Sequence, residues 1–159
     1  LTVTIFEGDT PNDNLYLTEV MYSPQSNGFD YEWVEFYNPN DIAIFVNSWT
    51  IADNEQKDNI VSEENEIITI PAKSVGILTS SPSTFRETYV NYKYVFSVED
   101  VAIGNGLGTS ETIILSKNSY NDAFTYTSED GANGNGKTLT RSCYNCADWS
   151  EAVSSPGTI

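Results

Sequence analysis

Two groups of residues have the types and the spacing that chemistry would require. The first is the stretch GANGNGKT at residues 131–138, which matches the GxxxxGK(S/T) pattern of phosphate-binding loops. Such a loop needs a helix directly after it, so that backbone amides and the helix N-terminus hold the phosphates. Here Glu129 and Asp130 place carboxylates beside the loop, and the following residues, 138–141, have the pattern of a strand. The sequence therefore favours a turn over a nucleotide site.

The second group consists of carboxylate pairs. Glu32 with Glu35, or Glu19 with Glu35, has the residue type of glycoside hydrolysis, because that reaction needs two carboxyl groups that flank the scissile bond. Catalysis would also require a cleft in which these groups converge with perturbed pKa values. The simpler interpretation is that Glu32 and Glu35 are strand charges that face solvent or a neighbouring lysine. We therefore expect no catalytic residue and no enzymatic activity.

Carboxylates also suit calcium, which takes oxygen ligands from flexible loops. Residues 53–58 form one acidic loop and residues 9–13 form another, and neither fits the EF-hand pattern. The alternative for both loops is solvated surface charge. No other cofactor is expected. The candidate calcium ligands are Asp53, Asn54, Glu55 and Asp58.

The chain contains no histidine. This absence excludes Ser-His-Asp and Cys-His catalysis and removes the commonest zinc ligand. The two cysteines, Cys143 and Cys146, form a lone CxxC, whereas a structural zinc site would need two further ligands. A disulfide that closes a small surface loop is the favoured interpretation, with two free thiols as the alternative.

The charge balance bounds the possible partners. The chain has 23 acidic and seven basic side chains, which gives a formal net charge of −16. Nucleic acids and anionic membrane surfaces both attract Lys and Arg, so this chain is expected to bind neither. No apolar run is long enough for membrane insertion. Aromatic residues make up 13% of the chain, too many for a disordered segment. Several of them, Tyr22, Phe29, Tyr31, Tyr92 and Tyr94, could form a platform for carbohydrate or protein, or could belong to the core.

Residues 31–53 read as strand, turn, strand, turn and strand, and they are expected to supply the centre of a core. In the first of these strands the side chains alternate, so we expect one face to be buried, with Trp33 and Glu35 on the other. Large aromatic residues anchor such cores. The expected core residues are Val34, Phe36, Trp49 and Ile51, and Trp149 is expected to pin the C-terminal tail to the body.

Other segments have the composition of short strands bounded by turn residues. In residues 15–22 the apolar spacing changes phase, which predicts a β-bulge near Thr18-Glu19. Residues 54–65 are polar and acidic, and we interpret them as a solvated loop. The remaining strand candidates are 1–6, 66–70, 74–80, 90–97, 112–116, 121–127 and 137–142.

A chain of 159 residues has the size of one domain. Many short strands with turns between them predict an all-β sandwich. Residues 81–89 add one short helical turn, because Ser81 suits an N-cap and Pro82 suits the first turn. We expect residues 1–14 to form an N-terminal strand or linker, and residues 128–159 to form a C-terminal extension packed on the sandwich.

Several blocks, taken in order, resemble the lamin-tail domain in its prokaryotic form. The similarity covers about residues 15–157 and ends with Trp149 and a Ser-Pro-Gly at 155–157. It also aligns GKTL of the would-be phosphate loop with a turn that leads into a strand. The blocks are LTEVMYSP (17–24), EWVEFYNP (32–39), SWTIAD (48–53), IPAKSVGILT (70–79), IGNGLGTSETIILS (103–116) and GKTLTR (136–141).

This resemblance implies an immunoglobulin-like β-sandwich without enzymatic activity. In prokaryotes the family sits in secreted or cell-surface multidomain proteins. The chain is therefore expected to be an extracellular or cell-surface binding, targeting or adhesion module, whose partner is a protein or a cell-surface polymer. Its acidity argues against the chromatin binding of animal lamins. The alternative is a calcium-dependent or carbohydrate-binding β-sandwich module.

Overall fold

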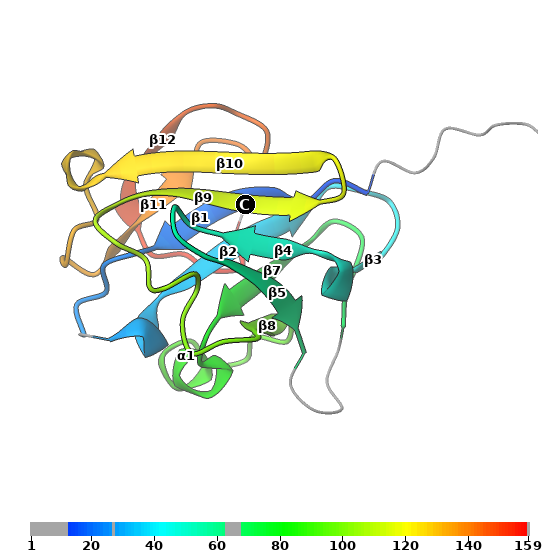
Figure 1. The fold of residues 1–159 in the computed structure, drawn as a ribbon, viewed down its shortest axis with the longest axis horizontal. Coiled ribbons are helices and arrows are strands. Elements are labelled where there is room, and N and C mark those ends of the chain that lie inside the picture. Colours follow the sequence, from blue (N-terminus) through cyan, green and yellow to red (C-terminus); the bar gives the residue numbers. More distant parts are fainter. Residues whose placement is uncertain (1–12, 27, 63–67, 159) are drawn as a thin grey trace, which may run out of the picture.

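The computed structural model describes residues 13–26, 28–62 and 68–158, so the strand expected at 1–6 lies outside the described residues. Ten strands form one sheet in the order β10-β9-β4-β5-β8-β7-β2-β1-β11-β12 (Figure 1). These strands are β1 (Tyr16–Met21), β2 (Trp33–Asn38), β4 (Thr50–Ala52), β5 (Lys57–Val61), β7 (Ser74–Thr79), β8 (Val95–Val98), β9 (Ser110–Lys117), β10 (Tyr120–Thr127), β11 (Lys137–Arg141) and β12 (Trp149–Val153).

The smaller elements lie at the ends and corners of this sheet. A separate two-stranded ladder joins β3 (Ile44–Phe45) to β6 (Thr69–Ile70). The helix α1 (Pro82–Thr88) connects β7 to β8, which pair in parallel, whereas the other ladders are antiparallel. Three short 3-10 turns complete the elements: η1 (Phe29–Tyr31), η2 (Val46–Ser48) and η3 (Ser128–Asp130). The predicted all-β fold with one short helix is confirmed.

The sheet curls over on itself, so that β9, β10 and β4 lie in front of β1, β2 and β7 (Figure 1). The main core fills the space between these two layers, and its buried side chains come from both. Val34 and Phe36 of β2 contribute to it. Ile51 of β4 and Trp49, which directly precedes β4, contribute as well, and none of the four side chains is more than 1% exposed. Burial of such side chains is the main favourable term in folding.

The predicted bulge in β1 is confirmed. Leu17 pairs with Phe36 and Glu19 pairs with Glu35, so Thr18 is the extra residue at which the register shifts. Because side chains alternate along a strand, this insertion lets both Leu17 and Val20 point into the main core. It also places Glu19 beside Glu35 on the outer face of the sheet.

The expectation that β2 buries one face is wrong, because its outer face is covered as well. Trp33 on that face is 2% exposed. It packs edge-on against Phe85 of α1 and against Tyr89, with 5.8 Å between ring centroids in each pair. These rings belong to a second apolar cluster, formed by Met21, Trp33, Ile77, Phe85 and Val95.

Two further expectations are corrected. Residues 54–65 were expected to form a solvated loop, but β5 occupies residues 57–61 in the middle of the sheet, where Asp58 and Ile60 are buried. An acidic residue is tolerated there because Asp58 receives a backbone N–H from Gly104. The strand expected at 90–97 begins only at Val95. The break at 71–73 and the helix after Ser81 are as predicted.

Arg141 of β11 joins the first and last parts of the curled sheet. Its guanidinium donates two hydrogen bonds to the carboxylate of Asp122 on β10, at 2.7 and 3.2 Å, and one to the carbonyl oxygen of Leu17 on β1. The Arg141 and Asp122 side chains are only 9% and 12% exposed. Arg141 also lies over the ring of Trp149, 5.5 Å from its centroid. Residues far apart in the sequence therefore meet at one ion pair.

We expect Arg141→Met to lower the free energy of unfolding by roughly 3–5 kcal/mol, because it leaves the Asp122 carboxylate buried without its partner. The control is Lys137→Met, which breaks the exposed ion pair with Glu151 and should cost roughly 0–1 kcal/mol. Urea denaturation of both variants measures the difference. Similar losses in the two variants would show that the Arg141 ion pair does not close the sheet.

Candidate functional site

Three buried carboxylates hold the glycine-rich loop between β8 and β9. Glu32 accepts a hydrogen bond from the backbone N–H of Leu107 at 2.9 Å, and Asp53 accepts one from Asn105 at 3.0 Å. Asp58 accepts one from Gly104 at 2.6 Å. Gly104 is required here, since its φ is 59° and a Cβ would lie 1.9 Å from the Asp53 carboxylate. These side chains therefore position a loop.

Several candidate calcium ligands accept hydrogen bonds from N–H groups of the protein itself. Besides its bond to Asn105, Asp53 accepts the backbone N–H groups of Glu55 and Gln56. Asn54 accepts from the Thr112 backbone at 3.3 Å, and the Glu55 carboxylate accepts from the Asn105 amide at 2.5 Å. Within residues 13–26, 28–62 and 68–158, no group of three or more acidic, cysteine or histidine side chains is arranged to hold a metal ion.

The paired carboxylates are buried, which corrects the expectation that Glu32 and Glu35 face solvent. Glu19 and Glu35 are both 0% exposed, and Glu32 is 6% exposed. Hydroxyl donors satisfy the pair: Thr138 donates to Glu19 at 2.5 Å and Thr18 donates to Glu35 at 2.7 Å. The sequence could not show this, because the groups that cover these carboxyls come from distant segments.

Burial raises the pKa of these carboxyl groups. The pKa of Glu32 is raised to about 7, mainly by loss of water, against which the Leu107 hydrogen bond acts. The pKa of Glu35 is raised to about 7 by the same cause, with a further contribution from the charge of Glu19. The pKa of Glu19 is raised as well. Each group is hydrogen-bonded to the protein itself.

The would-be phosphate loop binds a carboxylate of the chain. The Glu151 carboxylate accepts a hydrogen bond from the backbone N–H of Ala132 at 2.6 Å. It also forms an ion pair with the Lys137 ammonium group at 2.5 Å. Strand β11 begins at Lys137, so no helix N-terminus points at the loop. Hydrogen bonds from the loop hold the pKa of Glu151 at about 2. The donors that would hold phosphate are therefore used within the fold.

The cysteine pair and Trp149 lie near the C-terminal end of the described chain. Cys143 and Cys146 are joined by a disulfide. The ring of Trp149 stacks on Phe124 of β10, with 3.8 Å between centroids. Arg141 binds the carbonyl oxygen of Cys146 at 2.5 Å. These contacts attach the C-terminal segment to both ends of the sheet.

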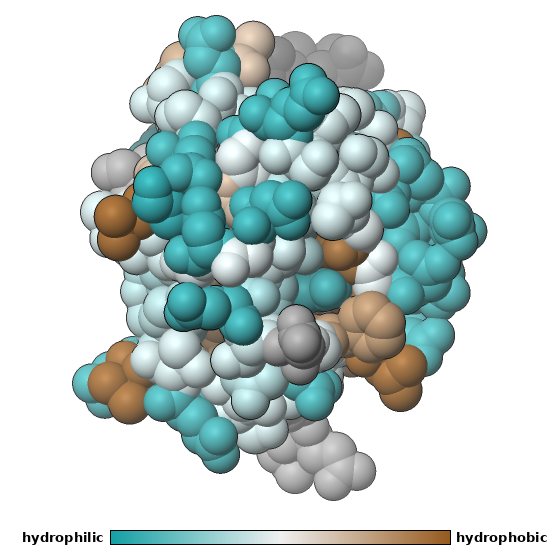
Figure 2. All heavy atoms as spheres, turned by 90° about the vertical axis from the view of Figure 1, so that its left-hand side faces the viewer, coloured by the Kyte–Doolittle hydropathy of each residue, from teal (hydrophilic) through white to brown (hydrophobic). Residues whose placement is uncertain are grey.

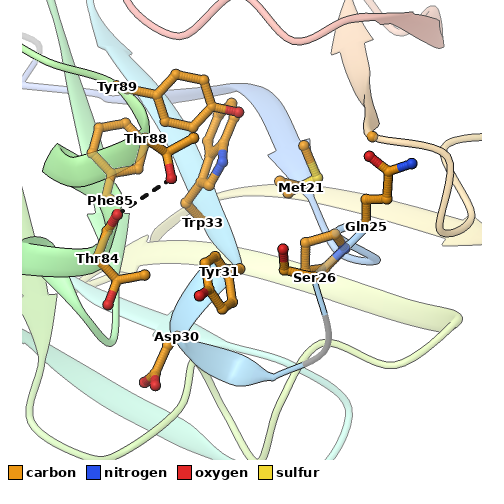
Figure 3. A pocket seen from close by; sticks show the side chains of 12 residues that line it. Met21, Gln25, Ser26, Asp30, Tyr31, Trp33, Thr84, Phe85, Thr88 and Tyr89 are labelled. Atoms are coloured by element: carbon orange, nitrogen blue, oxygen red, sulfur yellow. Dashed lines mark hydrogen bonds between the residues drawn. The ribbon is translucent and has the colours of Figure 1, made fainter.

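A pocket of about 210 Å³ lies between α1 and the segment that follows β1 (Figure 3). We call it the α1 pocket. Figure 3 shows α1 on one side, residues 21–26 on the other, and Trp33 and Tyr89 between them. Its lining includes Met21, Gln25, Ser26, Asp30, Tyr31, Trp33, Thr84, Phe85, Thr88 and Tyr89.

The α1 pocket combines aromatic walls with uncharged polar groups. Among the described lining residues, Asp30 is the one that carries a charge. Tyr31 at the end of the pocket is 40% exposed, and Phe29 near it is 50% exposed. Of the other aromatic candidates, Tyr22 is buried, and Tyr92 and Tyr94 pack partly buried against the apolar clusters. Tyr31 is the one candidate of the aromatic platform that lines this pocket, whereas its polar residues gave no signal in the sequence.

We expect the free energy of unfolding to fall as the pH rises from about 5 to about 8. The native state keeps protons on Glu32 and Glu35 up to about pH 7, whereas the unfolded chain releases them near 4.5, so the native state binds more protons between these values. This stability is therefore present at low pH and lost as the pH passes 7. Thermal unfolding at several pH values measures the effect.

Glu32→Gln keeps an acceptor for the Leu107 N–H but cannot titrate, so its unfolding midpoint should depend less on pH. Glu129→Gln, at an exposed position, changes the net charge equally and should behave as the parent chain does. An equal pH dependence in the Glu32 and Glu129 variants would contradict the assignment.

Comparison with known proteins identifies the family. A family model described as Lamin Tail Domain matches residues 9–138, which is most of the chain. A comparison with curated proteins and with solved structures found no match. The matched region contains the carboxylates that hold the glycine-rich loop and the helix that forms the α1 pocket. The chain therefore belongs to the lamin tail domain family, whose members are immunoglobulin-like β-sandwich modules, generally without enzymatic activity.

Proposed function

We propose that this chain is a binding module of a larger secreted or cell-surface protein, and that the α1 pocket receives a side chain of a protein partner. The pocket is the observation that carries this proposal. It is open to solvent, and it lies between two segments that leave polar side chains at its edge (Figure 3). The buried carboxyl groups of Glu19, Glu32 and Glu35 do not line it, and Asp30 is the carboxylate among its described lining residues.

The size of the α1 pocket suits one side chain. At about 210 Å³ it is smaller than the pockets that bind most cofactors and drug-sized ligands. Aromatic walls favour an apolar or amphipathic group, and Asp30 favours a positive charge at one end. A lysine or arginine, with its apolar stem along the aromatic walls and its charge near Asp30, fits these features.

The charge of the whole chain supports a cationic partner. The net charge is −16, and a field of this sign speeds the approach of basic surfaces and repels acidic ones. Figure 2 shows a face on which hydrophilic side chains predominate and hydrophobic atoms occur as separate spots. A broad apolar contact is therefore absent from that face, and recognition there would depend on charge and on pockets.

One observation and the family resemblance support a location outside the cell. The Cys143–Cys146 disulfide is of a kind that persists in oxidising compartments. The resemblance to the prokaryotic form of the family implies the same location, since secreted or cell-surface proteins are where such domains are expected. In the described part of the chain, no helix has the length and apolar composition needed to cross a bilayer.

We do not expect nucleic acid as a partner, because too few basic side chains are present to displace its counterions.

A displayed library of random peptides, selected on the immobilised chain, tests the proposed function. We expect enriched peptides to carry a basic side chain next to an apolar or aromatic one. Thr88→Trp, at the edge of the pocket, should weaken their binding at least about tenfold, since the added ring fills the site. Ser83→Trp is the matched control, because Ser83 is exposed on the same helix and does not line the pocket.

Two outcomes would overturn the proposal. Equal binding by the Thr88 and Ser83 variants would exclude the α1 pocket as the site. Binding of oligosaccharides on a glycan array, lost in Thr88→Trp, would favour the carbohydrate-binding alternative. Thermal unfolding with calcium and with chelator tests the calcium-dependent alternative, because a ligand of the native state must raise the unfolding midpoint.

A further inference from the structure

A short segment at the C-terminal end crosses the outer face of the sheet. We call residues 154–157 the strap. The strap follows β12 and is held by the carboxyl groups of Glu19 and Glu35. Glu19 accepts the backbone N–H of Ser155 at 2.9 Å, and Glu35 accepts that of Gly157 at 2.5 Å. The strap therefore donates two backbone hydrogen bonds to a pair of buried carboxyl groups.

Other contacts also hold the strap, in which Pro156 is buried. Ser154 shares a hydrogen bond with the hydroxyl of Tyr89 at 2.8 Å, and Gly157 lies so close to Tyr92 that a Cβ would be 2.6 Å from its ring. Strand pairing ends at Val153, so the strap has no ladder partner within the described residues. The two carboxyl groups supply its hydrogen bonds to β1 and β2.

The two carboxyl groups are direct neighbours. Glu19 and Glu35 are paired residues of β1 and β2, so their side chains leave the same face of the sheet, and both are 0% exposed. The charge that acts on Glu35 is that of Glu19. The Tyr92 hydroxyl lies close enough to the pair for both glutamates to raise its pKa, after the larger effect of burial, and the Tyr89 hydroxyl bonds to Ser154 of the strap. Lys73 shares a surface hollow with Gly157, but its ammonium group pairs with Asp41.

We propose that the strap is a pH-dependent latch, closed while the Glu19–Glu35 pair holds a proton and opened when both groups are ionised. Two buried charges of the same sign repel each other, and they regain water only when the strap lifts. On opening, the proton passes to solvent. The closed state thus binds more protons than the open state, so a rising pH favours opening.

The midpoint of this transition follows from the same carboxyl groups. Burial raises the pKa of Glu35 to about 7 and raises that of Glu19 above its ordinary value. The hydrogen bonds from the strap and from the threonine hydroxyls act against this shift, but burial is the larger effect. We therefore expect the latch to open as the pH passes about 7.

Opening of the latch would also affect the α1 pocket. Tyr89 lines that pocket and bonds to Ser154 of the strap, so release of the strap frees the Tyr89 hydroxyl. This consequence rests on the proposed function, whereas the latch itself does not. The experiment below uses no ligand, so failure of the latch and failure of the binding proposal remain distinguishable.

The test follows the backbone amide signals of Ser155 and Gly157 by NMR from about pH 5 to about pH 9. We expect both signals to move together with a midpoint near pH 7, and their hydrogen exchange, corrected for its intrinsic pH dependence, to lose protection above it. Glu35→Gln keeps an acceptor for the Gly157 N–H but cannot ionise. In this variant the strap should stay protected at high pH, and Glu19→Gln should act in the same way.

Glu129→Gln is the matched control, because this exposed glutamate lies on η3 and makes the same change in net charge. Its strap signals should titrate as in the parent chain. Strap signals that do not respond to pH in the parent chain would overturn the proposal. The same holds if Glu19→Gln and Glu35→Gln titrate as the control does, since the pair would then not govern the strap.

Discussion

A carboxylate that has lost water needs hydrogen-bond donors, and five buried acidic side chains make this requirement the constraint on which the structure depends. Each one accepts a backbone N–H from a segment outside the regular strands. The glycine-rich loop is bound by three of them, and the strap is bound by the other two. The five are Glu32, Asp53 and Asp58 for the loop, and Glu19 and Glu35 for the strap.

The acidic composition thus serves two physical purposes. Most carboxylates of the described residues are not buried, and they set the field that approaching molecules meet. The buried ones attach irregular segments to the sheet, and the cost of their burial appears as raised pKa values in Glu19, Glu32 and Glu35. Their stabilising effect therefore varies with pH, whereas that of the apolar core does not. The α1 pocket is lined by none of these buried carboxylates, and it lies beside a second apolar cluster that covers the outer face of the sheet.

Features that depend on neighbours in the sequence could be predicted. The bulge at Thr18 follows from the apolar spacing in β1, and α1 follows from Pro82 in its first turn, whereas Ser81 holds the N-cap position without a side-chain capping hydrogen bond. Strand β5 could not be predicted, because Asp58 reads as a loop residue until Gly104 supplies its donor. The burial of Glu35 was missed for the same reason, since Gly157 donates to it across 122 positions of the sequence.

The sequence by itself determined the all-β fold, the short helix and the core residues of β2 and β4, because alternation and turn chemistry act over a few residues. It also determined the family. Only the tertiary structure decided which acidic residues are buried, that Arg141 joins β11 to β10 and β1, and that a pocket lies beside α1. These features depend on contacts between distant segments, and such contacts leave no periodic pattern in the chain.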